Sequence, residues 1–151
     1  MRASIDIETA LCEFMESDGY SASAHRIPAT LGQSLPHVHV VRTGGTTSDM
    51  VIESNNVDFD VYAEDEADAM TAASNLCAWI RALPGSRLET YCYTSEVTTL
   101  PYNNPDPRHP NIGRVTAKAQ INTRTAETQG PRAKEYFLIA DTGEDLSANI
   151  S

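Results

Sequence analysis

Two histidines on one predicted strand are the residues of this sequence whose types and spacing most directly suggest chemistry. His37 and His39 alternate with valines, so their imidazoles lie on the same strand face, about 7 Å apart. Such a pair occurs in metal sites, and His25 or Asp58 is the candidate third ligand. Nothing in the sequence places either residue there, and the alternation alone predicts two strand histidines that face solvent or a subunit contact.

A second cluster of possible ligands is acidic. Asp58 and Asp60 share a strand face, and Glu64 and Asp65 follow shortly after. Carboxylates of this kind can bind a divalent metal or act as general acids and bases. The alternation around Phe59 and the start of a helix explain them as the solvated face of a strand followed by a helix N-terminus. We therefore expect no metal ion or cofactor.

The glycines and cysteines do not complete a recognised catalytic motif. Gly44-Gly45 lacks the later glycine and the Lys-Ser/Thr of a phosphate-binding loop, and the chain contains no G-x-S-x-G, C-x-x-C or H-E-x-x-H. Cys12, Cys77 and Cys92 have no paired spacing, so we interpret them as buried thiols in a reducing compartment. The residue types favour a structural or assembly role over an enzymatic one.

Hydrophobic periodicity predicts two helices. The first extends from Ser4, the expected N-cap, to Ser17, and the second extends from Glu64 to Leu83, before Pro84-Gly85. Each helix carries one apolar stripe, formed by Ile7, Leu11, Phe14 and Met15 in the first and by Ala69, Ala73, Leu76, Ile80 and Leu83 in the second.

Alternating sequence predicts four or five strands. They are AHRIP, LPHVHVVRTGG (ended by its two glycines), NVDFDVYA, RLETYCYTSEV and GRVTAKAQINTR. The resulting order, α-β-β-β-α-β-β, predicts an α+β fold: a mostly antiparallel sheet of four to five strands with both helices packed on one face.

The proline-rich segment from Leu100 to Val115 is expected to leave the sheet. Its four prolines fix φ and remove backbone donors, which predicts an extended excursion at the surface or at an interface. We place one domain at residues 1–125. Residues 126–151 form a polar C-terminal extension in which Tyr136 to Ala140 are apolar, expected to dock on the domain or on a neighbouring subunit, with disorder as the competing interpretation for the last ten residues.

The charge balance limits the possible partners. Eleven basic and twenty-one acidic residues give a net charge of −10, which argues against a general nucleic-acid binder. The same charge suits a protein past which DNA must slide, or a subunit that stays soluble until it docks. No apolar run approaches the roughly 20 residues that cross a bilayer, and the N-terminus lacks a signal-peptide block, so we expect an intracellular, soluble protein with no membrane contact.

The order of these features resembles the tail terminator, or minor tail, proteins of long-tailed bacteriophages. The segments that carry the resemblance are IDIETALCEFM, IPATLGQSLPHVHVVRTGG, NVDFDVYAEDEADAMTAASNL, RALPG, LPYNNPDPRHP and GRVTAKAQINTR. Together they cover about residues 4 to 125. In that family a proline-containing segment similarly precedes the final sheet strand.

The resemblance implies a non-enzymatic virion protein without a cofactor. Tail terminators form a ring, usually a hexamer, on the head-proximal end of the tail tube. There they end tube polymerisation and present a surface to the head connector or neck protein. The implied partners are therefore copies of the chain itself, the tail tube protein and the connector, while DNA passes through the lumen without specific binding. The implied location is the neck-proximal end of the tail, with assembly in the host cytoplasm.

Within that implied assembly, exposed loops become candidates for subunit or partner contacts. The candidates are Arg42, Met50, Tyr102, Arg108, His109, Tyr136 and Phe137. Tyrosine and arginine are favoured at interfaces, and a loop stiffened by prolines loses little entropy on docking. A solvated loop residue is the competing interpretation for each.

Three alternatives stay open on the sequence. A head–tail connector or head-closure neck protein would share the ring assembly. A small metal-dependent enzyme would use His37, His39 and an acid. A monomeric binding module would form no ring.

Overall fold

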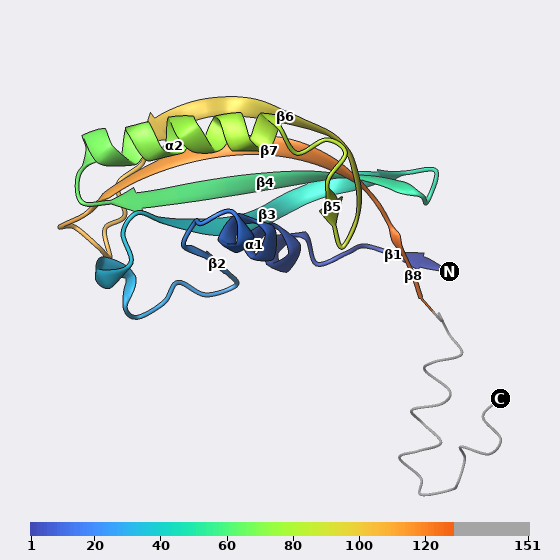
Figure 1. Cartoon of the computed structure of the whole chain (residues 1–151), viewed down its shortest axis with the longest axis horizontal. Helices are drawn as coiled ribbons and strands as arrows, with labels where there is room; N and C mark the ends of the chain where they lie inside the picture. Colours follow the sequence, from blue (N-terminus) through green and yellow to red (C-terminus); the bar gives the residue numbers. More distant parts are fainter. Residues whose placement is uncertain (129–151) are drawn as a thin grey trace, which may run out of the picture.

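The alternating segments pair into one six-stranded sheet in the computed structural model, which describes residues 1–128 (Figure 1). The strand order is β2-β3-β4-β7-β6-β5, antiparallel throughout except for the parallel pair β2 and β3. The sheet strands are β2 (Ala22–Ala24), β3 (His37–Ser48), β4 (Ile52–Ala63), β5 (Arg87–Leu88), β6 (Thr90–Asn103) and β7 (Gly113–Arg124). A separate pair joins β1 (Arg2–Ala3) to β8 (Ala126–Glu127). The α+β prediction is confirmed, and the additional strands are two-residue pieces.

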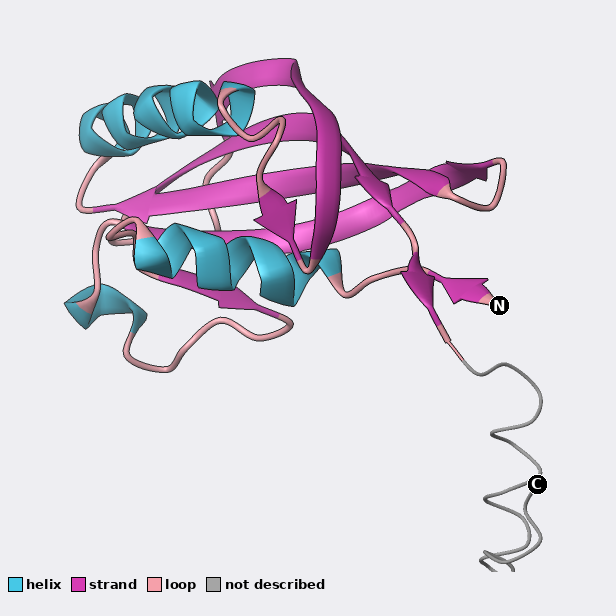
Figure 2. Ribbon diagram, turned by 45° about the vertical axis from the view of Figure 1, so that its right-hand side comes forward, coloured by secondary structure: helices cyan, strands magenta, loops and turns pink. Residues whose placement is uncertain are grey.

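Two helices cover one face of the sheet, as predicted (Figure 2). Helix α1 spans Ile7–Ser17 and α2 spans Glu66–Arg81, while η1 is a short 3-10 turn at Leu31–Gln33. The prediction that Ser4 caps the first helix is wrong. Asp6 is the N-cap, because its Oδ1 accepts a hydrogen bond from the Thr9 N–H at 3.2 Å. Aspartate is as good a cap as serine, and its charge also suits the helix dipole.

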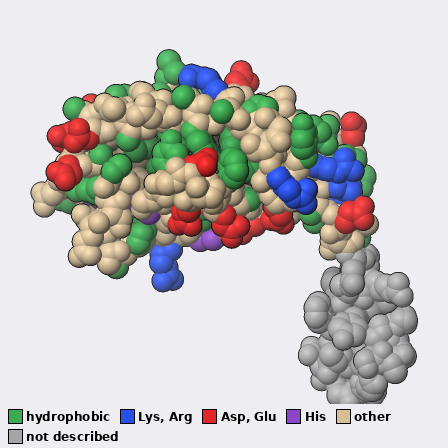
Figure 3. Space-filling model, viewed as in Figure 1, with side chains coloured by type: hydrophobic (Ala, Val, Ile, Leu, Met, Phe, Trp, Pro, Cys, Tyr) green, Lys and Arg blue, Asp and Glu red, His purple; other side chains and the backbone are tan. Residues whose placement is uncertain are grey.

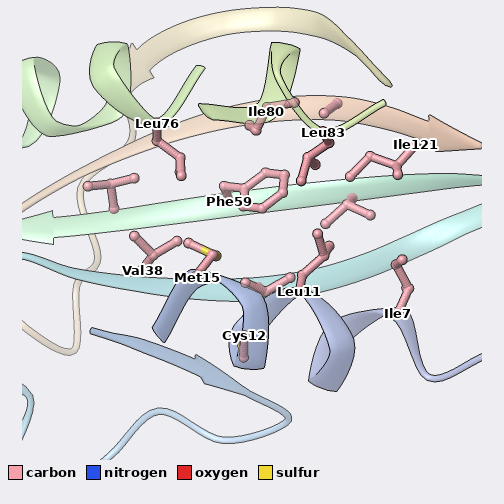
Figure 4. Packing of buried hydrophobic residues seen from close by; sticks show 14 of the residues in the cluster. Ile7, Leu11, Cys12, Met15, Val38, Phe59, Leu76, Ile80, Leu83 and Ile121 are labelled. Carbon is pink, nitrogen blue, oxygen red and sulfur yellow. The ribbon is translucent and has the colours of Figure 1, made fainter. Parts of the chain in front are cut away.

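The core lies between the helices and the sheet (Figure 4). Phe59 of β4 is fully buried at its centre, with Leu11 and Met15 of α1 on one side and Leu76 and Ile80 of α2 on the other. The predicted apolar stripes of both helices are confirmed. Each fully buried side chain of this size contributes about 1.5–3 kcal/mol to folding.

Strands β3 and β4 form a long hairpin, and we call its distal part the arm (residues 42–57; Figure 1). The β4 side of the arm stays paired with β7 up to Ile52↔Arg124, whereas its β3 side is an edge of the sheet. The prediction that Gly44-Gly45 ends the strand is wrong, because the two glycines form a bulge at which the pairing shifts and then continues to Ser48↔Ile52. Gly45 has a φ of +147°, and a Cβ there would lie 1.9 Å from the Ser54 carbonyl oxygen. Glycine is therefore required for the arm to stay paired.

The proline-rich segment is partly strand. Leu100 to Asn103 belong to β6, so the prediction that the whole segment leaves the sheet is wrong for these residues. Beyond Tyr91, no described strand pairs with the outer side of β6, so Pro101 has no ladder hydrogen bond to lose on that side. The remaining residues, 104–112, form the loop that leads into β7.

The three cysteines are buried, as predicted. Burial, followed by the nearby carboxylate of Glu16, raises the pKa of Cys12 to about 12, so this thiol stays protonated.

Within residues 1–128, no helix has the length and hydropathy of a membrane span. Of the proposed extension at residues 126–151, Ala126–Glu127 form β8 and pair with β1, and residues 129–151 lie outside the described residues.

Candidate functional site

The two strand histidines are buried, contrary to the expectation that they face solvent or a subunit. His37 and His39 are 2% and 8% exposed, on the sheet face opposite the helices. The ring nitrogens of His37 lie 2.7 Å from the Ser21 hydroxyl and 2.8 Å from that of Ser23, and Nδ1 of His39 lies 2.9 Å from Ser23. The parallel strand β2 brings these serines into register with the histidines. Periodicity could not reveal this pairing, because β2 is only three residues long. The predicted AHRIP strand is wrong in its bounds, since only its first residue, Ala24, belongs to β2.

The hydrogen bonds and burial define what these imidazoles can do. Burial lowers the pKa of both His37 and His39, so both rings are neutral near pH 7. Both ring nitrogens of His37 are occupied by serine hydroxyls. Neither candidate third ligand completes a site, since Asp58 accepts a hydrogen bond from Lys118 at 2.9 Å and His25 lies 3.0 Å from Glu8. Within residues 1–128, no three His, Cys, Asp or Glu side chains are grouped so that they could hold a metal ion.

The predicted acidic strand face is present. Asp58 pairs with Lys118, and Asp60 accepts a hydrogen bond from the Thr116 hydroxyl at 2.7 Å. The hydrogen bond to Asp58 raises the pKa of Lys118. These cross-strand contacts satisfy the half-buried carboxylates within their own sheet.

A buried aspartate anchors the 104–112 loop to this polar face. Both Tyr62, through its hydroxyl, and His109, through Nδ1, lie 3.0 Å from Asp106 Oδ2. The backbone N–H of Arg108 donates to Oδ1 at 3.0 Å, and the Arg114 guanidinium lies 3.7 Å away. Burial alone would raise the pKa of Asp106, but these hydrogen bonds outweigh it and hold the pKa well below its usual value. We call this set of contacts the Asp106 latch.

The predicted contact residues of the proline-rich segment differ in how far the Asp106 latch fixes their side chains. His109 is fixed against Asp106 and the Tyr62 ring, whereas the Arg108 side chain is 74% exposed although its Nε lies 3.4 Å from Asp106. Tyr102 lies on β6 opposite Thr116 and is exposed. Arg108 and Tyr102 thus remain accessible to a partner, while His109 has a contact within its own chain.

The predicted contact residues of the arm lie at its two ends. Arg42 lies at the bulge, where its backbone N–H donates to Glu8 Oε2 at 2.7 Å, and its side chain is half-buried. Met50 lies in the turn between β3 and β4 and is 69% exposed. The hydroxyl of Thr125 donates to the Met50 carbonyl at 2.9 Å, so the backbone of the turn is held while the thioether is free in solvent.

A pocket that the sequence did not indicate opens between the helices at the other end of the sheet. It has a volume of about 570 Å³ and is lined by Tyr20 after α1, Leu35 and Pro36 before β3, Val38 and Val61 of the sheet, and Ala72 of α2. These residues come from four separate segments, so no local sequence pattern marks them. The pocket is mainly apolar and suits an apolar side chain.

No protein-family model and no curated protein matches this chain.

The remaining contact candidates, Tyr136 and Phe137, lie outside the described residues.

Proposed function

We propose that this protein is a structural subunit of a phage tail, a terminator that forms a ring on the head-proximal end of the tail tube. The proposal rests on the resemblance across residues 4–125 and on surfaces suited to assembly. The single observation that carries it is the tip of the arm, a turn at the end of the sheet that presents an exposed methionine. The Met50 side chain adds no packing to the core of its own subunit.

The uses of the other polar groups are consistent with this role. His37, His39 and Asp106 are engaged in hydrogen bonds within their own chain, the histidines with the β2 segment and Asp106 with Tyr62 of the sheet. The net charge of −10 suits a ring through which DNA passes without adhering, because like charges repel. In this proposal the ring docks on the last layer of tube protein and blocks addition of the next layer.

The test is a capping assay. Purified protein is added to polymerising tail tube protein from the phage that encodes it, and tube length is measured by electron microscopy. We expect tubes of reduced, defined length that carry extra density at one end. Tubes that grow to the same length with and without the protein would contradict the proposal. Binding to tail-free heads in place of tube ends would identify the neck-connector alternative.

A further inference from the structure

The tip of the arm combines an unusual backbone with an exposed apolar side chain. Asp49 and Met50 have φ values of +57° and +60°, and the Val51 N–H donates to the Ser48 carbonyl at 3.3 Å. Ser48 to Val51 therefore form a turn with positive φ at both central residues, where glycine is favoured at the second, and three residues separate the paired Ser48 and Ile52. Met50 occupies that second position at a cost in backbone energy. The side chain has no role in the core that would explain this cost.

The apolar pocket offers a matching surface. Val38 and Val61 form its floor, and Tyr20 and Ala72 line its sides where α1 ends and α2 begins its second turn. On the side toward the arm, the ring of Trp79 contacts that of Tyr20 at 5.9 Å between centroids, which bridges the two helices. A flexible, unbranched thioether suits an opening of this irregular shape.

The tip and the pocket lie at opposite ends of the molecule (Figure 1). Val38 lies at the pocket and Ser48 lies at the turn, and ten strand residues at about 3.3 Å each separate them by about 33 Å. A chain therefore cannot place its own Met50 in its own pocket. A contact between the tip of one copy and the pocket of another uses two different surfaces, and repetition of such a heterologous contact closes into a ring when the rotation permits.

Charged side chains lie beside both surfaces. Arg124 pairs with Ile52 beside the turn, is exposed, has no ion pair among the described residues and lies with its guanidinium 3.4 Å from the Tyr93 hydroxyl, while the exposed Asp49 precedes Met50 in the turn. At the other end, Glu64 and Asp68 line a hollow that shares Leu35 and Pro36 with the apolar pocket. Figure 3 shows acidic side chains where α2 begins, and basic side chains with acidic ones beside them at the opposite end. In a contact between the two ends, Arg124 is the group that can pair with the acidic edge at Glu64 and Asp68.

We propose that Met50 of one copy inserts into the pocket between α1 and α2 of a second copy, with Arg124 beside the acidic turn at Glu64 and Asp68. The occupant of the pocket is a second copy of this chain. The proposal rests on the ring assembly proposed above and names the contact that builds it.

The direct test is cross-linking between two variants. Met50→Cys and Ala72→Cys chains are prepared separately, mixed and treated with a short thiol-specific cross-linker, since the native cysteines are buried. The expected result is a covalent dimer in the mixture at least tenfold more abundant than in either variant alone. A mixture with no more cross-linked dimer than the separate variants would overturn the proposal.

Matched substitutions test the energetics of the same contact by the concentration at which the oligomer dissociates. Met50→Gly removes the side chain while keeping the turn, and Ala72→Gln fills the pocket. Each is expected to raise that concentration at least tenfold. Leu100→Gly, at a residue exposed to 67%, and Ala78→Gln, on the same helix outside the pocket, are the controls and are expected to leave it unchanged.

The outcomes separate this contact from the proposed function. An oligomer that persists in Met50→Gly and in Ala72→Gln overturns the contact but leaves a ring built through other surfaces. A wild-type chain that is monomeric at every concentration also overturns the contact, and the capping assay then decides independently whether the protein acts on tail tubes.

The predicted ion pair between Arg124 and Asp68 of two copies is tested by charge reversal. Arg124→Glu is expected to weaken assembly, and Asp68→Arg is expected to restore it when introduced into the same chain, because every interface then regains an opposite pair. A double variant that is as weak as or weaker than Arg124→Glu alone would contradict the predicted placement of Arg124.

Discussion

The arm tip and the 104–112 loop both connect neighbouring strands of the sheet, but they are held in opposite ways. The loop turns back onto the polar face, where Asp106 gathers hydrogen bonds from Tyr62, His109 and Arg108. The arm tip lies at the end of the sheet, and Thr125 holds its backbone while the Met50 side chain stays exposed. The 104–112 loop is thus fixed through a buried side chain, whereas the arm tip is fixed through its backbone and leaves an apolar side chain in solvent.

The strongest way to break this comparison is to remove the latch. Asp106→Ala leaves the buried Tyr62 hydroxyl without its acceptor and deletes a charge-assisted network, so we expect a loss of about 3 kcal/mol in the free energy of unfolding. Chemical denaturation of wild type and variant measures it. A loss below about 1 kcal/mol would mean that the loop is held by other contacts.

The pairing of the arm depends on the absence of a side chain at Gly45, and not on a network of side-chain hydrogen bonds. Gly45→Ala places a methyl group against the Ser54 carbonyl and is expected to cost more than about 1 kcal/mol of unfolding free energy. Gly44→Ala is the matched control, since its φ of +142° is similar but no atom lies within 4 Å of the added Cβ. Equal losses from the two variants would show that conformation, and not the predicted contact with Ser54, sets the cost.

Acidification should weaken the polar face in two steps. Folding lowers the pKa of His37 and His39, so the unfolded chain binds more protons below pH 6.5, and stability falls as the pH decreases from that value. The pKa of Asp106 is also lowered, so a second loss begins below pH 3.8. Thermal unfolding between pH 7.5 and 5 isolates the first step, and His37→Gln should reduce its slope. A variant slope equal to that of wild type would exclude His37 as a cause.

The smallest changes in unfolding free energy are expected for the two exposed side chains, Arg108 of the loop and Met50 of the arm. Arg108→Ala should change the unfolding free energy by less than about 0.5 kcal/mol, because the side chain is largely exposed. Met50→Gly should leave the stability of the folded subunit unchanged or slightly raised, since glycine relieves the positive φ. Denaturation under conditions where the protein is monomeric measures both. A clear loss from Met50→Gly would mean that the methionine stabilises its own subunit.

The sequence predicted the elements that have a period and missed those that depend on contacts between distant segments. Helices α1 and α2 and the alternation around Phe59 were recognisable because one face of each is buried in a common core. The N-cap is Asp6 and not the predicted Ser4, because both are suitable capping residues and they lie within one helical turn of each other. The continuation of β3 past Gly44-Gly45 could not be read from composition, because a bulge and a strand end use the same residue.

The candidate site was predicted less well than the fold. Burial of His37 and His39 depends on serines of a three-residue strand, and the Asp106 latch joins residues from β4, β7 and the loop. Neither arrangement has a local signature. Met50 was recognisable as a candidate in an exposed loop, but the pocket at the opposite end exists only once four segments have come together.

The most direct measurement of the central claim is the mass of the native particle in solution, by light scattering after size-exclusion chromatography at two concentrations. The account predicts a discrete oligomer near six times the chain mass of 16.4 kDa at the higher concentration. A particle with the mass of a single chain at both concentrations would contradict the claim that these subunits assemble through their own surfaces.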